Sequence, residues 1–322
     1  MNRRDLFGRA TAVVGALTVS SQAFAQLESH GAGRDSKTSN PHASVQEAAQ
    51  GSTQASTSDA AKPASEAPTL TVRHVTIGKG QPKIVVPITG KSSPQVLEMA
   101  EKIAQSDAAD LAEFRIDYLS EPGADPGGTA ALCQSVRHTL GDKPLLATFR
   151  TKREGGEQAI DESDYERLYG AIITAKAADL VDIQMMLDES RVKRLVDLAH
   201  AHGVYVVMSN HNFHDTPPND VLIARLRRQQ SLGADILKIA AMPKTPSDAL
   251  RLMQATREMY DRYAERPLLT MSMAADGIVS RLSGELTGSA LTYGSIGASS
   301  APGQLKAEEL KTVLSIIHHS AF

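Results

Sequence analysis

A single lysine, Lys238, lies in the middle of the short apolar run 236–242. Runs of this length and composition are typical of β-strands that are buried on both faces. Burial lowers the pKa of a lysine, and the neutral amine is a nucleophile that can attack a ketone and form a Schiff base. From this run alone, a lysine that reaches solvent or an acidic partner at a strand end is the alternative interpretation.

Further side chains with catalytic or binding capacity follow other apolar runs. A histidine exchanges protons near neutral pH, and an arginine can hold a carboxylate through two parallel hydrogen bonds. Taken singly, each has an ordinary structural interpretation: His211 could be a hydrogen-bonded core histidine, and Glu113 and Arg115 could form an ion pair. The polar residues at these positions are Glu113, Arg115, Arg150, Glu154, His211, His214, Arg281, Ser300 and Gln304.

The elements that must position these side chains are predicted from periodicity. Apolar residues at helical spacing from Val192 to Ala199, and again from Leu310 to Ile317, indicate helices that follow strands. An alternating stretch over residues 69–80, which ends in glycine, predicts a β-hairpin. The predicted strands are 83–90, 111–117, 145–150, 180–186, 204–210, 236–242, 268–273 and 291–296.

Eight strand–helix units in roughly 250 residues match the count and size of a (β/α)8 TIM barrel. We therefore predict an α/β fold of this kind with an N-terminal β-hairpin. A doubly wound open sheet is the alternative, but no G-x-G-x-x-G turn follows a predicted strand, which counts against a dinucleotide-binding fold. In a barrel the carboxyl ends of the strands meet at one rim, where active sites lie. Six of the eight predicted strands end in polar residues, so these side chains should meet there.

The segments before the barrel indicate export. The pair Arg3-Arg4, the short apolar run 10–19 and the small residues of Ala23-Phe24-Ala25 predict a signal peptide over residues 1–25. The arginine pair favours the twin-arginine type over an ordinary secretory leader, and a periplasmic or secreted protein is expected.

Residues 26–68 are rich in Ala, Ser, Gln, Thr and Gly, which predicts a disordered linker. The catalytic domain would then span residues 69–322. A formal net charge of −3 gives no electrostatic case for nucleic acid binding. The only cysteine is Cys133, so an intrachain disulfide and a cysteine-based metal site are excluded. The short apolar runs give no stable membrane anchor.

Six motifs are distinctive and follow one another in a characteristic order. They are PKIVVPITGK (82–91), FRTKREGGEQ (149–158), MSNHNFHDTP (208–217), GADILKIAAMP (233–243), TMSMAADGIVSRLSGE (270–285) and SSAPGQ (299–304). From about Thr69 to its end the chain resembles type I 3-dehydroquinate dehydratase. The resemblance implies loss of water from 3-dehydroquinate to give 3-dehydroshikimate through an imine, without a metal or cofactor. Family members are often dimers, so it also allows a homodimer.

The resemblance assigns the catalytic roles residue by residue. Lys238 of the KIA motif would be the Schiff-base nucleophile. His211, the first histidine of SNHxFH, would be the general acid and base for imine formation and proton removal. Glu154 of the REGGE motif would orient His211 and tune its charge.

The same resemblance assigns the binding roles. Arg281 of the SRL motif would hold the substrate carboxylate, and Ser300 and Gln304 would bind the carboxylate and ring hydroxyls. The remaining hydroxyls would contact Glu113, Arg115 and Arg150. Arg150 or Arg115 close to Lys238 is expected to depress the lysine pKa by like-charge repulsion. Met271 and Met273 would form an apolar wall.

Some positions depart from the family pattern. Gln184 stands where an acidic residue is usual, Tyr293 stands where phenylalanine is common, and the stretch 297–304 differs from a more basic version. Another lysine-dependent barrel enzyme, such as a class I aldolase, and a non-catalytic binder of cyclic hydroxy acids are the alternative functions. Outside the cytoplasm, the dehydration would serve breakdown of quinate rather than synthesis of aromatic amino acids.

Overall fold

The computed structural model describes residues 67–120, 122–297 and 303–321. The predicted signal peptide, nearly all of the predicted linker and Ser300 lie outside the described residues. Within them, the predicted hairpin is formed by β1 (Leu70–Val72) and β2 (Val75–Ile77), which pair antiparallel.

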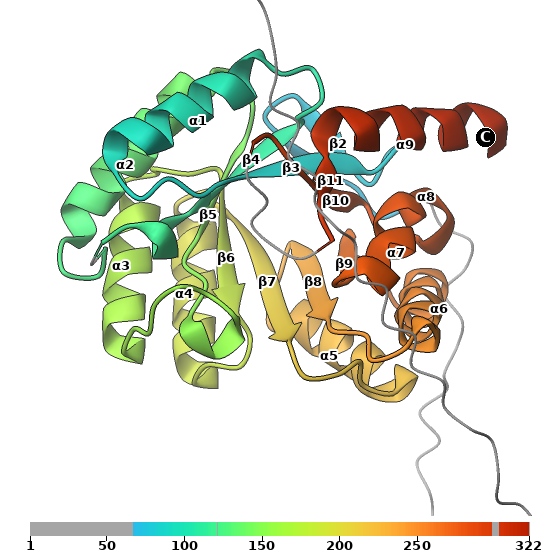
Figure 1. The fold of residues 1–322 in the computed structure, drawn as a ribbon. Coiled ribbons are helices and arrows are strands. Elements are labelled where there is room, and N and C mark those ends of the chain that lie inside the picture. The colour runs from blue at the N-terminus through green and yellow to red at the C-terminus, as the bar shows by residue number, and fades with distance from the viewer. Residues whose placement is uncertain (1–66, 121, 298–302, 322) are drawn as a thin grey trace, which may run out of the picture. The chain divides into compact units, whose positions relative to one another are not determined.

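All eight predicted barrel strands are present, and they curl into one parallel sheet (Figure 1). Neighbouring strands pair in the order β10-β3-β4-β5-β6-β7-β8-β9. The circle closes between β9 and β10, where Leu268 and Ser289 form a bridge and the Ala290 amide donates to the Leu268 carbonyl at 2.7 Å. The TIM-barrel prediction is confirmed. The strands are β3 (Lys83–Ile88), β4 (Leu111–Arg115), β5 (Leu145–Thr148), β6 (Leu180–Gln184), β7 (Tyr205–Asn212), β8 (Ile236–Ala241), β9 (Leu268–Ser272) and β10 (Leu291–Ser295).

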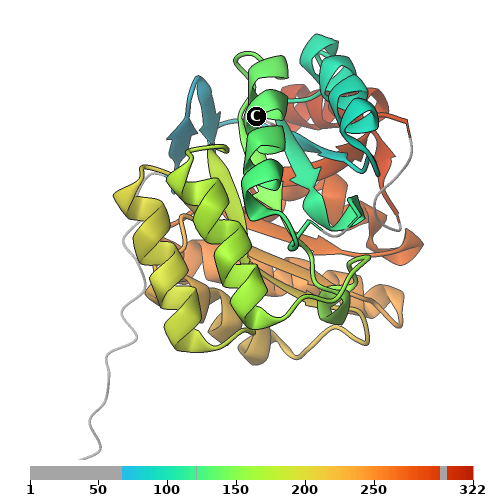
Figure 2. The ribbon, with the colours of Figure 1, turned by 90° about the vertical axis from the view of Figure 1, so that its left-hand side faces the viewer.

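Helices cover the outside of the barrel, as the side view in Figure 2 shows. Two of them carry the periodicity seen in the sequence, because Val192, Leu195, Val196 and Ala199 are all buried and so are Leu310 and Leu314. The longer helices are α1 (Ser93–Gln105), α2 (Pro126–Thr139), α3 (Glu162–Thr174), α4 (Glu189–Ala201), α5 (Asn219–Ser231), α6 (Pro246–Arg262) and α9 (Ala307–Ala321). The short helices α7 (Ile278–Leu282) and α8 (Gly284–Thr287) follow β9, and the two-residue strand β11 (Leu305–Lys306) pairs with β10.

Strand β5 ends two residues earlier than predicted, because a tyrosine hydroxyl takes the place of the backbone hydrogen bonds between β5 and β6 there. The last β5–β6 pair is Thr148 with Asp182. Beyond it, the Phe149 amide donates to the Tyr169 hydroxyl at 2.9 Å, and that hydroxyl donates to the Asp182 carbonyl at 2.6 Å. The pairing of the two strands ends at this point.

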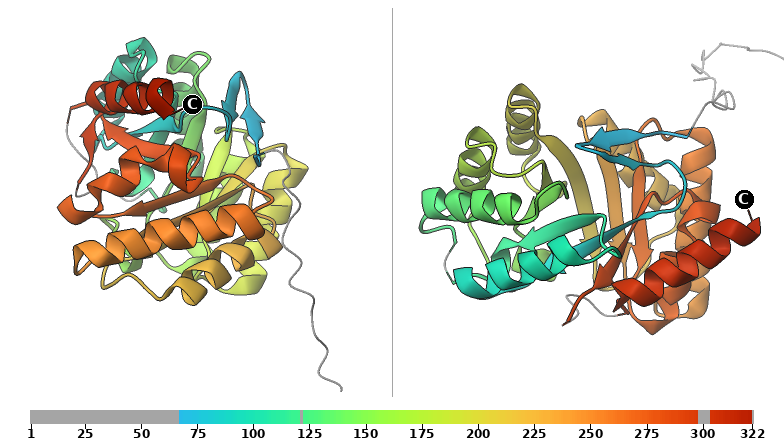
Figure 3. Two further views of the ribbon diagram at one scale, coloured as in Figure 1. Left: turned by 90° about the vertical axis from the view of Figure 1, so that its right-hand side faces the viewer. Right: turned by 90° about the horizontal axis from the view of Figure 1, so that it is seen from above.

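The hairpin closes the amino-terminal end of the barrel. Val72, Val75 and Ile77 are buried in one cluster with residues at the beginnings of the strands, such as Leu111 and Leu180. Figure 3 shows the hairpin, in blue, against the barrel strands. A second cluster fills the space between the strands and the outer helices.

An arginine fixes the hairpin to the barrel. Arg73 donates through Nε to Asp179 at 2.9 Å, and Arg137 of α2 donates to the same carboxylate at 2.8 Å. Among the residues described, no helix combines the length and the apolarity needed to cross a membrane.

Candidate active site

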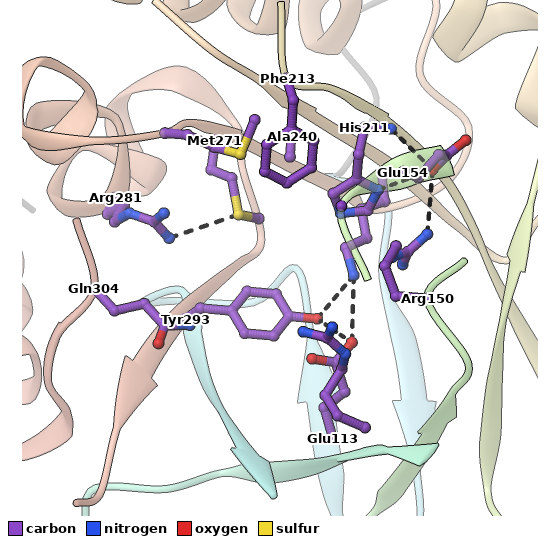
Figure 4. A pocket seen from close by; sticks show the side chains of 14 residues that line it. Glu113, Arg150, Glu154, His211, Phe213, Ala240, Met271, Arg281, Tyr293 and Gln304 are labelled. Atoms are coloured by element: carbon purple, nitrogen blue, oxygen red, sulfur yellow. Dashed lines mark hydrogen bonds and ion pairs between the residues drawn. The ribbon is translucent and has the colours of Figure 1, made fainter. Parts of the chain in front are cut away.

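A pocket opens at the carboxyl ends of the barrel strands (Figure 4). Every described residue to which the resemblance assigns a role lines it, and so do the two methionines of the expected apolar wall, whereas His214 is exposed and does not line it. Alternation along each strand explains this convergence: on β8, Ile236, Lys238 and Ala240 face the barrel interior, whereas Leu237 and Ile239 pack against the helices. The lining residues are Glu113, Arg115, Arg150, Glu154, Gly155, His211, Phe213, Lys238, Ala240, Met271, Met273, Arg281, Tyr293 and Gln304.

Lys238 is buried, and its ammonium group has acidic and phenolic partners. Nζ lies 2.9 Å from Oδ2 of Asp182, 3.0 Å from the Tyr293 hydroxyl and 3.5 Å from Oε1 of Glu113. Burial lowers the pKa of Lys238, but Asp182, Tyr293 and Glu113 outweigh burial and the opposing charge of Arg150, so the pKa lies above its ordinary value. The expectation of a depressed lysine pKa is wrong, because it left out these partners.

Asp182 is the central carboxylate of the site, and the sequence analysis missed it. Its Oδ2 accepts from Lys238 and, at 2.7 Å, from Arg150, while Oδ1 accepts from the Ser209 hydroxyl. Burial raises its pKa, but the charges of Arg150 and Lys238 prevail and lower the pKa to about 2. The signal that identified Lys238, a charged residue inside a buried strand, is present in β6 too and would have found Asp182.

His211 lies at the end of β7 beside Glu154, which belongs to the short 3-10 helix Lys152–Glu154. Oε2 of Glu154 lies 3.2 Å from Nδ1 of the ring and also accepts the His211 amide at 3.1 Å. A carboxylate in contact with Nδ1 favours the tautomer with hydrogen on Nδ1, which leaves Nε2 as the proton acceptor. Burial, followed by the charges of Arg150, Lys238 and Arg115, lowers the pKa of His211 well below 6.5. The imidazole is therefore a neutral base at neutral pH.

Arg150 connects the histidine pair with the lysine pair. Its guanidinium donates to Glu154 at 3.2 Å, to Ser209 at 2.8 Å and to Asp182 at 2.7 Å. Burial raises the pKa of the Glu154 carboxyl, and the charge of Arg150 opposes this rise. Arg150 thus stabilises two carboxylates from one buried position.

The ordinary interpretation of Glu113 and Arg115 as an ion pair does not describe their main contacts. Arg115 donates through two nitrogens to Asp117, at 2.8 and 2.7 Å. Glu113 accepts the Thr148 hydroxyl at 2.9 Å and the Tyr293 hydroxyl at 3.0 Å. Both side chains nevertheless reach the pocket wall, as predicted.

The opposite side of the pocket suits an anion beside an apolar surface. Arg281 of α7 is buried, and its Nη1 lies 3.6 Å from the Met271 sulfur. Burial lowers the pKa of Arg281 to about 10, so the guanidinium stays charged at neutral pH. Gln304 reaches the pocket from the segment that leads into β11, and Figure 4 shows it on the same side as Arg281.

Four lining residues were not among the predicted site residues, namely Gly155, Phe213, Ala240 and Tyr293. Phe213 lies across Gly155, whose φ is +80°, and a Cβ there would come within 2.2 Å of the phenyl ring. Only glycine therefore allows this ring to cover the edge of the pocket. Gln184 lies outside the set of residues that line this pocket. Its side-chain amide accepts from the Thr151 backbone amide at 2.8 Å and donates to the Thr151 hydroxyl at 3.0 Å.

The side chains in residues 67–120, 122–297 and 303–320 form no group of three or more His, Cys, Asp or Glu that could hold a metal ion.

Comparison with known proteins identifies the family. A model of the type I 3-dehydroquinase family matches residues 84–321. The 3-dehydroquinate dehydratase of Bacillus licheniformis is 47% identical over 249 residues, covering 77% of this chain and 97% of that protein. The chain belongs to the type I 3-dehydroquinase family. The 3-dehydroquinate dehydratase of Escherichia coli O8 is 45% identical over 252 residues, covering 78% of this chain and 99% of that protein.

Solved structures of family members share the fold. Type I 3-dehydroquinate dehydratase from Clostridium difficile, solved with covalently modified comenic acid, aligns with a TM-score of 0.76 and 40% identity, covering 78% of this chain and 98% of that one. The Geobacillus kaustophilus 3-dehydroquinate dehydratase also aligns with a TM-score of 0.76, at 37% identity over 80% of this chain and 99% of that one. The chain is therefore a hydro-lyase that dehydrates 3-dehydroquinate, a reaction of the shikimate pathway, and this favours the dehydratase function over the aldolase and binding-protein alternatives.

Proposed function

We propose that this dehydration proceeds through an imine between Nζ of Lys238 and the ketone carbon of the substrate. The observation that carries the proposal is the buried lysine at the pocket wall, with its ammonium group bound to Asp182 and a neutral histidine on the neighbouring strand. An iminium is a much better electron sink than a ketone, so it acidifies the adjacent C–H bond.

The other lining residues receive roles that follow from their chemistry. Arg281 binds the substrate carboxylate, and Met271 and Met273 support the apolar side of the ring. Gln304, Glu113 and Arg115 bind ring hydroxyls, and Ser300 joins them from outside the described residues.

His211 acts on both reacting positions. Its Nε2 takes the proton from the carbon next to the iminium, and the electrons of that C–H bond move toward the nitrogen. The enamine then expels the neighbouring hydroxyl, which receives a proton from His211 and leaves as water. Water finally hydrolyses the imine, which releases the product ketone and Lys238. Glu154 holds the ring in the required tautomer throughout.

Borohydride trapping tests this proposal. Incubation with 3-dehydroquinate followed by reduction should leave an adduct on the peptide that carries Lys238, and Lys238→Ala should yield none. Continued formation of 3-dehydroshikimate by Lys238→Ala would contradict the imine mechanism.

We also propose that the protein is exported and acts on dehydroquinate that arises from quinate outside the cytoplasm. The arginine pair, the short apolar run and the Ala23-Phe24-Ala25 sequence support export. Cell fractionation should find the protein in the periplasm or medium, and Arg3→Lys with Arg4→Lys should retain it in the cytoplasm. A deletion strain should grow without aromatic amino acids but poorly on quinate. Aromatic auxotrophy would contradict the catabolic role.

A further inference from the structure

The ammonium group of Lys238 must lose a proton before the lysine can react. Nζ contacts the carboxylates of Asp182 and Glu113, and these partners raise the pKa of the lysine, so Lys238 carries an ammonium group. An ammonium nitrogen has no lone pair and cannot attack a ketone. A group in contact with Nζ must therefore accept a proton before the imine forms.

Asp182 is poorly suited to accept it, although its oxygen is the nearest. The same Oδ2 atom also binds the permanent cation Arg150 at 2.7 Å, and Oδ1 is occupied by the Ser209 hydroxyl. Protonation would remove the counter-charge of a completely buried guanidinium, which is costly. Asp182 thus serves as a fixed counter-ion.

A second path leaves Nζ through Tyr293. The ammonium donates to the tyrosine oxygen at 3.0 Å, and the tyrosine O–H donates to Oε1 of Glu113 at 3.0 Å. The donors point in one direction from nitrogen to carboxylate. Figure 4 shows the Tyr293 hydroxyl pointing to Glu113. Nζ itself lies 3.5 Å from the same oxygen, a longer contact than either step through Tyr293, and the neutral hydroxyl of Thr148 donates to that oxygen at 2.9 Å.

We propose that Tyr293 relays a proton from the Lys238 ammonium to Glu113, and so generates the amine that attacks the substrate. This inference rests on the proposed imine at Lys238. The N–H bond of Lys238 breaks as its proton binds the tyrosine oxygen, and the tyrosine O–H proton passes to Glu113. The products are a neutral amine, an unchanged tyrosine and a neutral carboxylic acid.

The protons balance over imine formation. The amine attacks the ketone carbon, and one proton on nitrogen shifts to the former carbonyl oxygen. Glu113 returns the relayed proton to that oxygen, which leaves as water. The iminium keeps one N–H bond and the positive charge, and Glu113 is again a carboxylate, ready for the next turnover.

The variant Tyr293→Phe removes only the hydroxyl group and so tests its role. The ring centroid lies 5.0 Å from Nζ, and phenylalanine keeps this cation–π contact and the packing. In a single turnover quenched with borohydride, we expect adduct formation to slow by about a hundredfold, the size of a general acid–base contribution. KM should stay within about threefold of the wild-type value, because binding of the substrate does not need the relay.

Two further variants complete the test. Glu113→Gln should slow the same step, and the double variant should be no slower than the slower single variant, because both changes break one path. Tyr205→Phe, at the start of β7, removes a phenolic hydroxyl at the other end of the barrel and should react like the wild type. Circular dichroism checks the fold of each variant, and Tyr293→Phe alone decides the outcome where Glu113→Gln does not fold.

Three results would overturn the relay. They are adduct formation by Tyr293→Phe within about threefold of wild type, multiplicative losses in the double variant, and a solvent deuterium isotope effect on adduct formation that is the same in wild type and Tyr293→Phe. Absence of an adduct on Lys238 in the wild-type protein would refute the imine itself, and the relay with it.

Discussion

The charges of the site act as one buried network rather than as separate pairs. Lys238, Arg150, Asp182 and Glu154 are all buried, and each is within hydrogen-bonding distance of at least one other member. Charges removed from water are stable only when each is compensated, so the network fixes the protonation state of its members. Beside this network, burial and the charges of Arg150 and Lys238 lower the pKa of His211, so its imidazole is neutral at neutral pH.

Removal of the central carboxylate should damage both stability and activity. Asp182→Asn leaves Lys238 and Arg150 with too little negative charge, at a cost of roughly 3–5 kcal/mol in the free energy of unfolding. The free energy is measured by urea denaturation, and kcat should fall because the lysine loses its fixed position. Asp197→Asn on the exposed face of α4 is the control, and equal stabilities of the two variants would contradict the network.

The pH dependence of kcat/KM should follow His211. Its pKa in the folded protein lies well below 6.5, so the rate should decline only in acid below that value as the imidazole is protonated. The unfolded chain binds this proton more readily, so the contribution of His211 to stability is present above pH 6.5 and is lost as pH falls toward the folded pKa. A profile of kcat/KM against pH tests this prediction. A fall in kcat/KM that already begins above pH 6.5 as the solution is acidified would contradict it.

The point at which strand β5 ends helps to orient the catalytic side chains. Strand β5 stops at Thr148, and the hydroxyls of Tyr165 and Tyr169 then occupy the gap beside β6. The two rings stack with centroids 4.4 Å apart. Their contact with the Asp182 carbonyl fixes the backbone of the central carboxylate from behind.

Removal of one of these hydroxyls should therefore lower both the stability and the activity of the enzyme. Tyr169→Phe leaves the Phe149 amide without its bond to the tyrosine and should lower the free energy of unfolding by about 1–3 kcal/mol. Because Arg150 and Asp182 flank the gap, kcat should fall as well. Tyr118→Phe, on a half-buried ring, is a matched control for urea denaturation and steady-state kinetics. If Tyr169→Phe leaves both the urea midpoint and kcat unchanged, the tyrosine contacts at this gap do not orient Arg150 and Asp182.

The whole molecule separates stability and chemistry between the two ends of the barrel. The hairpin fills one end with Val72, Val75 and Ile77, and the pocket occupies the other. Apolar packing can therefore vary at the closed end without moving the charges at the open end.

This separation predicts how a hairpin variant behaves. Ile77→Ala, at a completely buried position, should lower the free energy of unfolding by about 2–5 kcal/mol through the cavity it leaves. At a temperature where the variant is folded, kcat and KM should equal those of the wild type. Thr71→Ala, on the exposed face of β1, is the control for both measurements. A change in kcat of more than about threefold would show that the two ends are coupled.

Local sequence patterns were enough to predict the elements, the fold and the family. Periodicity is local, so all eight barrel strands and the hairpin could be predicted, and the motifs carried the family resemblance. The rule that the carboxyl ends of barrel strands meet at one rim also placed Lys238 and His211 there. The predicted end of β5 was less accurate. That end depends on the hydroxyl of Tyr169, which belongs to helix α3 and not to the strand.

The tertiary structure alone decided which charges meet and what they do to one another. Lys238 is 56 residues from Asp182, 55 from Tyr293 and 125 from Glu113 along the chain, and barrel register brings all three to one nitrogen. The sequence offered Arg150 and Arg115 as neighbours and so suggested a lowered lysine pKa. The sign of a pKa shift depends on the balance between burial and every nearby charge, which only the assembled barrel fixes.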